Sequence, residues 1–149
     1  MALRTKLVTI DTPAQPAVPE TVVDGKKVPA KPAKDAGRDH GKSYLITEMD
    51  AFRAEWWAIK LALALGKAGM ELPENVQGMA AIAVAGMGAL MKIDPADAKP
   101  LLDEMLGCCA YQHAPGHPTL PLTGSGVVEE ASTLLTLRKE VFKLHTGFL

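Results

Sequence analysis

Apolar side chains recur at three- and four-residue steps in several stretches of this chain, and this spacing predicts amphipathic helices. The first helix is expected over 50–67, where Phe52, Trp56, Ile59 and Leu63 share one face, as a core-facing stripe would. Three further helices are expected over 74–92, 100–110 and 128–145. The pattern therefore indicates a chain that is mainly helical.

Local signals predict where the helices begin. Asp50 and Asp94 carry side chains that accept hydrogen bonds from the free amides at the start of a helix. Pro95 suits the first helical position after Asp94, whereas Pro100 interferes with a continuous helix. We therefore expect a turn over 94–98 and a helix that starts at about Pro100.

Two short stretches are predicted to be strands. Residues 2–10 show a weak two-residue alternation, and 43–47 form a short apolar run after a turn. We expect these two strands to pair. Residues 111–126 are a loop by composition, with room for a short strand within 119–123 or 126–128.

Residues 11–37 differ from the rest of the chain because they contain five prolines and no aromatic residue. Such a segment cannot bury enough apolar surface to offset its ordering entropy, so a flexible linker is expected. A small hairpin over Asp24 and Gly25 is the local alternative, since this dipeptide is typical of tight turns. No internal repeat is evident.

These signals predict a strand at 1–10, a flexible linker at 11–37 and a helical domain at 38–149. A chain of 149 residues suits one compact domain with such a segment attached. The expected fold class is mainly α within the α+β group. It consists of about four helices, a short β element and a flexible N-terminal arm rich in Pro, Ala and Lys.

Charge argues against two classes of partner. The formal net charge is −1, so no global field points to nucleic acid or to an anionic membrane. Residues 1–42 hold 8 Lys/Arg against 5 Asp/Glu, and residues 43–149 hold 8 against 12. A basic arm on an acidic body explains this mild asymmetry. The longest apolar run, 79–91, is too short to span a bilayer.

Candidate chemistry is sparse. Cys108 and Cys109 are adjacent, which offers no disulfide framework and indicates a reducing, intracellular environment. With His113 and His117 they form a metal-capable group, but the spacing matches no standard zinc pattern. Residues 40–43 resemble the end of a phosphate-binding loop, except that the required glycine is replaced by Ala36. We therefore expect no metal, no cofactor and no enzymatic activity.

One segment resembles a known family, the tail assembly chaperones of long-tailed bacteriophages. The shared pattern is R-D-x-G-K-x-[YF]-x-[IL]-T-E-M, followed by a helix with an acidic residue and Trp and then by an Ala/Leu-rich stretch. The matching residues are Arg38, Asp39, Gly41, Lys42, Tyr44, Ile46, Thr47, Glu48, Met49, Glu55, Trp56 and Trp57. Residues 134–148 are similar to the family's terminal segment, and the two segments together cover about a third of the chain.

The resemblance implies a non-catalytic assembly factor in the host cell cytoplasm that is absent from the mature virion. Its implied partner is the phage tape measure protein, with the major tail tube protein as a further partner and self-association left open. A structural tail or head–tail connector component is the alternative. A holin-like membrane hairpin over 56–72 and 76–91 is disfavoured, because Lys60, Lys67 and Glu71 lie within it.

The partner-binding residues are expected on and beside the first helix. Trp56 and Trp57 point to different faces, so either one of them is exposed to a partner or both are covered by other elements of the chain. Cations seven residues apart form one stripe, and methionines suit adaptable apolar contact. The predicted residues are Trp56, Trp57, Arg53, Lys60, Lys67, Met70 and Met79.

Overall fold

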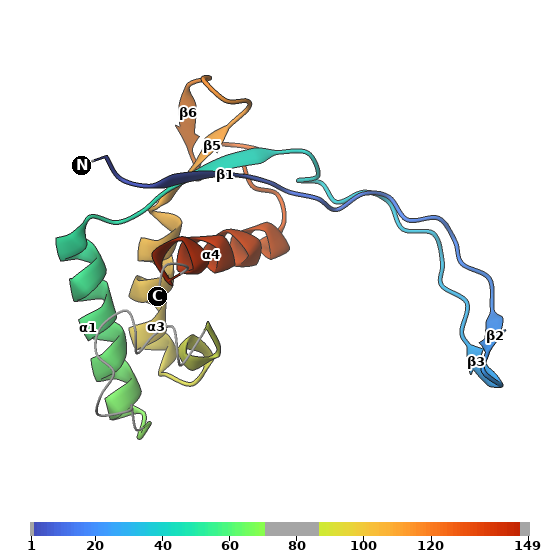
Figure 1. Cartoon of the computed structure of the whole chain (residues 1–149), viewed down its shortest axis with the longest axis horizontal. Coiled ribbons are helices and arrows are strands. Elements are labelled where there is room, and N and C mark those ends of the chain that lie inside the picture. The colour runs from blue at the N-terminus through green and yellow to red at the C-terminus, as the bar shows by residue number, and fades with distance from the viewer. Residues whose placement is uncertain (1, 71–86, 147–149) are drawn as a thin grey trace.

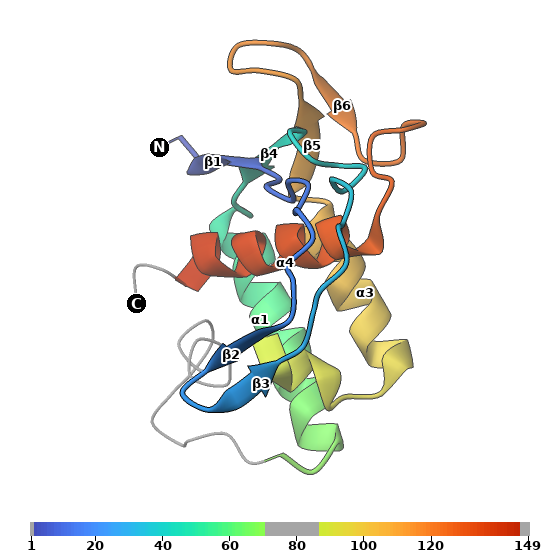
Figure 2. The ribbon, with the colours of Figure 1, turned by 90° about the vertical axis from the view of Figure 1, so that its right-hand side faces the viewer.

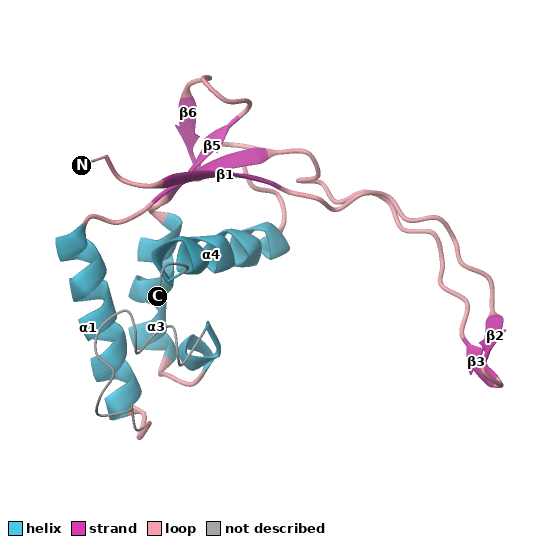
Figure 3. Cartoon of the chain, in the orientation of Figure 1, coloured by secondary structure: helices cyan, strands magenta, loops and turns pink. Residues whose placement is uncertain are grey.

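The computed structural model describes residues 2–70 and 87–146. Within these residues the fold is α+β, with a four-stranded sheet above three α-helices and a long arm that leaves the sheet (Figures 1 and 3). The expectation of about four helices with only a short β element is therefore wrong. Most of the helix predicted over 74–92 lies outside the described residues, and its last part, Met87–Met91, is a 3-10 helix, η1.

The main sheet is antiparallel and has the order β1-β4-β5-β6. Its strands are β1 (Thr5–Thr9), β4 (Ser43–Thr47), β5 (Cys109–Gln112) and β6 (Thr119–Pro121). The predicted pairing of the first two is confirmed, with Thr5 opposite Thr47 and Thr9 opposite Ser43. The strand expected within 119–123 is also confirmed, whereas β5 was missed.

The helices are α1 (Ala51–Lys67), α3 (Pro95–Leu106) and α4 (Ala131–Thr146). Helix α4 lies beneath the sheet and contacts β1 and β4, and α3 packs against both α4 and α1 (Figures 1 and 2). The core fills the space between these elements. Its largest fully buried apolar side chains are Tyr44, Ile46, Leu61, Leu65, Met105, Leu137 and Val141.

Helix α3 begins about five residues earlier than the sequence predicted. Asp94 is the expected N-cap and accepts a hydrogen bond from the Ala96 amide at 2.8 Å, with Pro95 at the first position. Pro100 lies inside the helix, so the predicted turn over 94–98 is wrong. A proline there removes one backbone hydrogen bond, and burial of Leu101 and other residues of α3 holds the helix together.

Residues 11–37 form the arm, which is paired along its length. The hairpin predicted over Asp24 and Gly25 is confirmed: β2 (Thr21–Val23) and β3 (Lys26–Val28) are antiparallel, and both turn residues have positive φ. Every residue from 11 to 36 is exposed. The arm therefore leaves the body as a two-stranded ribbon (Figure 1), and its flexibility stays a prediction.

Candidate partner-binding face

Helix α1 carries apolar side chains on two opposite faces. One face is buried and consists of Trp57, Ala58, Leu61, Ala64 and Leu65. The other consists of Phe52, Trp56, Ile59 and Leu63, which are 86%, 57%, 37% and 66% exposed. These four residues follow one another at steps of four, three and four, so they fall within an arc of roughly 60°. We call them the outer face of α1.

The outer face is the stripe that the sequence pattern presented as core-facing. Both stripes of α1 have helical spacing, so periodicity alone could not tell which one the fold buries. The choice follows from Trp57, whose ring Nε1–H donates to the Leu101 carbonyl oxygen of α3 at 3.0 Å. Its neighbour Trp56 is then turned towards solvent, because adjacent helical positions are about 100° apart.

The predicted cationic stripe borders this face but is mostly engaged within the molecule. Lys60 pairs with Glu104 at 2.8 Å and Lys67 pairs with Asp97 at 3.4 Å, so both tie α1 to α3. Arg53 is exposed, and its backbone amide is held by the Asp50 cap at 3.0 Å. The predicted residues Trp56 and Arg53 are therefore accessible, whereas Trp57 belongs to the core.

Of the two predicted methionines, Met70 is half-buried and packs against the core. Met79 lies outside the described residues. The sequence interpretation omitted the exposed members of the outer face other than Trp56, because it assigned their stripe to the core. The sequence did contain a signal for these residues. Helix α1 has two apolar stripes, and packing one side of a helix on a core requires only one.

The family-like motif has a structural role in this fold. Asp39 is fully buried and accepts hydrogen bonds from the Glu129 amide at 3.0 Å, the Glu130 amide at 3.0 Å and the Thr133 hydroxyl at 2.5 Å. Lys42 donates to the same carboxylate at 2.9 Å. Asp39 thus caps the chain that enters α4.

The electrostatics of this cap follow from its hydrogen bonds. Burial by itself raises the pKa of the Asp39 carboxyl, but donation from Thr133, Lys42 and the two backbone amides outweighs burial and lowers the pKa to about 2. Lys42 also binds the Gly126 carbonyl and Glu129, and its hydrogen bond to Asp39 raises its pKa. The carboxylate and the ammonium group are therefore both held in their charged forms.

A third motif residue, Tyr44, ties the sheet to the same loop. The Tyr44 hydroxyl donates to the Val127 carbonyl oxygen at 2.6 Å, and burial raises the pKa of the phenol to about 12. Together, Asp39, Lys42 and Tyr44 hold β4 and the base of the arm against the segment before α4. These motif residues stabilise the fold and are not part of the exposed face.

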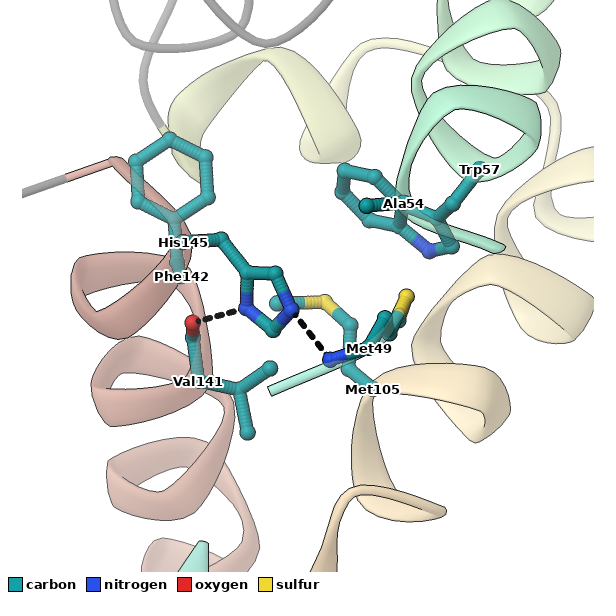
Figure 4. Close-up of a pocket in the computed structure, with 7 residues that line it drawn as sticks. All are labelled: Met49, Ala54, Trp57, Met105, Val141, Phe142 and His145. Atoms are coloured by element: carbon teal, nitrogen blue, oxygen red, sulfur yellow. Dashed lines mark hydrogen bonds between the residues drawn. The ribbon is translucent and has the colours of Figure 1, made fainter. Parts of the chain in front are cut away.

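A small apolar cavity lies between α1, α3 and α4 (Figure 4). Its lining residues are Met49, Ala54, Trp57, Met105, Val141, Phe142 and His145. The His145 ring bridges the Val141 carbonyl oxygen and the Met49 amide, each at 2.8 Å, so Nδ1 donates and Nε2 accepts. Both ring nitrogens of His145 are thereby engaged by the backbone, and the cavity has no polar group left to orient a ligand.

The cysteines are core residues. Cys108 and Cys109 are buried, and burial raises the pKa of their thiols to about 11 and about 12. Protonated thiols are poor nucleophiles and poor metal ligands. The rings of His113 and His117 contact each other edge to face, 5.7 Å apart. Over residues 2–70 and 87–146, no group of three or more His, Cys, Asp or Glu could hold a metal ion.

In comparisons with known proteins, no family model, curated protein or solved structure matches this chain. A proposal about its function therefore rests on its own residues and structure. None of the helices that the structure describes is long and apolar enough to cross a membrane. The second segment of the holin-like alternative lies mostly outside the described residues. The outer face of α1 is the largest cluster of exposed apolar side chains within a single described helix.

Proposed function

We propose that this protein is a phage tail assembly chaperone that binds an apolar helical segment of the tape measure protein on the outer face of α1. The observation that supports the proposal most strongly is the exposure of Phe52, Trp56 and Leu63 on one helix. Clustered exposed apolar side chains are typical of protein interaction sites. The resemblance over Arg38–Trp57 supplies the class of partner.

The spacing of the face suits a helical partner. An amphipathic helix buries its apolar stripe by packing residues at three- and four-residue steps into a matching surface. The outer face has the same steps, and each large side chain that becomes fully buried contributes roughly 1.5–3 kcal/mol. Arg53 lies on one flank of the stripe and Glu55 on the other, so the charges can set the orientation of the partner.

The proposal includes the cellular setting. The protein acts in the host cytoplasm, keeps the tape measure protein soluble, assists recruitment of the tail tube protein, and leaves before the virion is complete. No catalytic step is part of it. Binding alone suffices, because a long apolar partner aggregates unless its exposed stripe is covered.

Co-expression tests the proposal. The tape measure protein should be soluble with the wild-type chain and should aggregate with the variant Trp56→Ala/Leu63→Ala. The matched control is Leu135→Ala, which truncates a leucine that is 50% exposed on α4. This control should retain full solubilising activity. A tape measure protein that is equally soluble alone, or that never co-purifies, would overturn the proposal.

The arm supports a second candidate, a structural component of the tail or of the head–tail connector. A ribbon that leaves its own body is suited to joining subunits of a permanent assembly. Mass spectrometry of purified virions separates the two candidates. The chaperone is expected to be absent from the particle, whereas a structural component would be present in stoichiometric amounts.

A further inference from the structure

The arm contains a short repeat that explains its pairing. Thr12, Gln15, Val18 and Thr21 on the outgoing strand lie opposite Gly37, Lys34, Lys31 and Val28 on the returning strand. The pairing thus recurs every three residues, which is the period of a polyproline II helix. The triplets are Thr-Pro-Ala, Gln-Pro-Ala and Val-Pro-Glu from residue 12, and Val-Pro-Ala, Lys-Pro-Ala and Lys-Asp-Ala from residue 28.

The first two positions of each triplet have different roles. The first residue pairs across the ribbon, as in the two bonds between Gln15 and Lys34 at 2.8 and 2.9 Å and the two between Val18 and Lys31 at 2.8 Å. A proline follows in five of the six triplets, where its missing N–H costs the ribbon nothing and its ring fixes φ. The arm is therefore extended because of its sequence and does not depend on a core.

These prolines also determine how the arm can be recognised. Along residues 13–19 and 29–32 a neighbouring strand adds poorly, because the prolines remove donors that such a ladder needs. What the arm offers instead is an extended apolar surface of Pro, Ala and Val, with Val18, Val22 and Val23 between 44% and 66% exposed. Domains that recognise proline-rich extended segments contact them through aromatic side chains.

The outer face of α1 displays aromatic side chains on the same chain. It displays Phe52 and Trp56 beside Ile59 and Leu63. A chain cannot cover its own face in this way, because the arm extends from the side of the body opposite α1 (Figure 1). The arm is long enough to cover the stripe, since 12 residues at about 3.1 Å each reach about 37 Å, against about 17 Å for the stripe.

The charges of the two surfaces are complementary. Residues 11–24 of the arm carry three acidic and no basic residues, whereas residues 25–37 carry four lysines and one aspartate. The flanks of the outer face differ in the same way, with Arg53 on one side and Glu55 on the other. A ribbon lying along α1 with its acidic strand beside Arg53 places its basic strand beside Glu55.

We propose that the arm of one copy of this chain lies across the outer face of α1 of a second copy, so that copies associate head to tail. The contact is heterologous, which means that it produces a closed ring or an open chain. The arm covers the face that binds the partner under the proposed function, so one molecule cannot make both contacts at once. The self-association uses only two surfaces of this chain and holds whatever the partner is.

Two full-length variants test the proposal. The arm variant is Val18→Asp/Val22→Asp/Val23→Asp, and the face variant is Trp56→Glu/Leu63→Glu; all five side chains are exposed, so both variants keep the core. Light scattering coupled to size exclusion should give an oligomer for the wild type and a monomer for each variant. An equimolar mixture of the two variants should give a dimer of twice the monomer mass, since only one junction can form. The control Leu135→Ala should behave like the wild type.

Three results would overturn this inference: a wild-type chain that is monomeric at its highest soluble concentration, an arm variant that still associates, or a mixture of the two variants that stays monomeric. Failure here is distinguishable from failure of the proposed function. The arm variant should still keep the tape measure protein soluble, because its outer face is intact, whereas the face variant should lose both activities.

Discussion

Asp39 joins two parts of the chain that are 90 residues apart in sequence, since its carboxylate binds the Glu129 and Glu130 amides ahead of α4. Local capping residues such as Asp50 and Asp94 could be predicted, because their partners lie within three residues. The role of Asp39 could not be predicted from residues alone, because the amides that it caps become neighbours only in the folded chain.

The lowered pKa of Asp39 makes stability depend on pH. Its carboxyl should contribute fully above pH 3.8, the ordinary pKa, and the contribution should disappear as the pH falls towards about 2. The difference between 3.8 and about 2 corresponds to roughly 2 kcal/mol. Asp39→Asn should lower the unfolding free energy by about that amount at neutral pH, and the gap between variant and wild type should close in acid.

Urea unfolding from pH 6 to pH 2 measures the difference in unfolding free energy between Asp39→Asn and the wild type. The pKa values of Glu48 and Glu140 are also lowered, by ion pairs with Arg4 and Lys6, but these groups are common to both proteins and cancel in the difference. The control Asp35→Asn changes an exposed carboxyl of the arm and should leave stability unaltered. An Asp39→Asn protein as stable as the wild type at neutral pH would contradict the capping role.

At the scale of elements, helical periodicity predicted α1 correctly but assigned its core-facing stripe wrongly. Two apolar stripes satisfy the same spacing, and only the contact of Trp57 with α3 decides between them. The strand β5 was missed for a related reason. It is four residues long and is defined by pairing with β4, with Tyr111 opposite Tyr44 and Cys109 opposite Ile46. Tertiary contact decides such elements.

The adjacent tryptophans should respond differently to truncation. Trp57→Ala removes a side chain that is 3% exposed and should cost about 3–5 kcal/mol of unfolding free energy. Trp56→Ala removes an exposed ring and should change stability by less than about 0.5 kcal/mol. Equilibrium urea unfolding of the two variants measures both values. Equal losses would show that the outer face is covered within the monomer.

At the scale of the whole molecule, the arm was expected to be a flexible linker because its composition cannot form a core. Residues 11–36 are exposed throughout, and the flexibility stays a prediction. The sequence analysis did not predict the pairing, because a three-residue repeat is much shorter than the periods of about 20–50 residues that are typical of repeat folds. Prolines at 13, 16 and 19, and again at 29 and 32, were the available signal. Prolines at three-residue steps are typical of an extended threefold strand.

Removing most of the arm should leave the body intact. Deletion of residues 14–35 keeps Thr12 and Gly37, whose backbone bond closes the base of the ribbon at 2.9 Å. Because residues 11–36 are exposed throughout, the unfolding free energy should change by less than about 1 kcal/mol. Thermal unfolding followed by circular dichroism checks this. A loss of several kcal/mol would mean that the arm packs against the body.

The central claim is that the outer face of α1 holds the tape measure protein, and photo-crosslinking in infected cells tests it most directly. A photoreactive residue placed at Leu63 on this face should form a covalent adduct that mass spectrometry identifies as the tape measure protein. The same residue placed at Leu135 on α4, which is 50% exposed, should form none. Crosslinking to the tape measure protein from position 135 but not from position 63 would contradict the account.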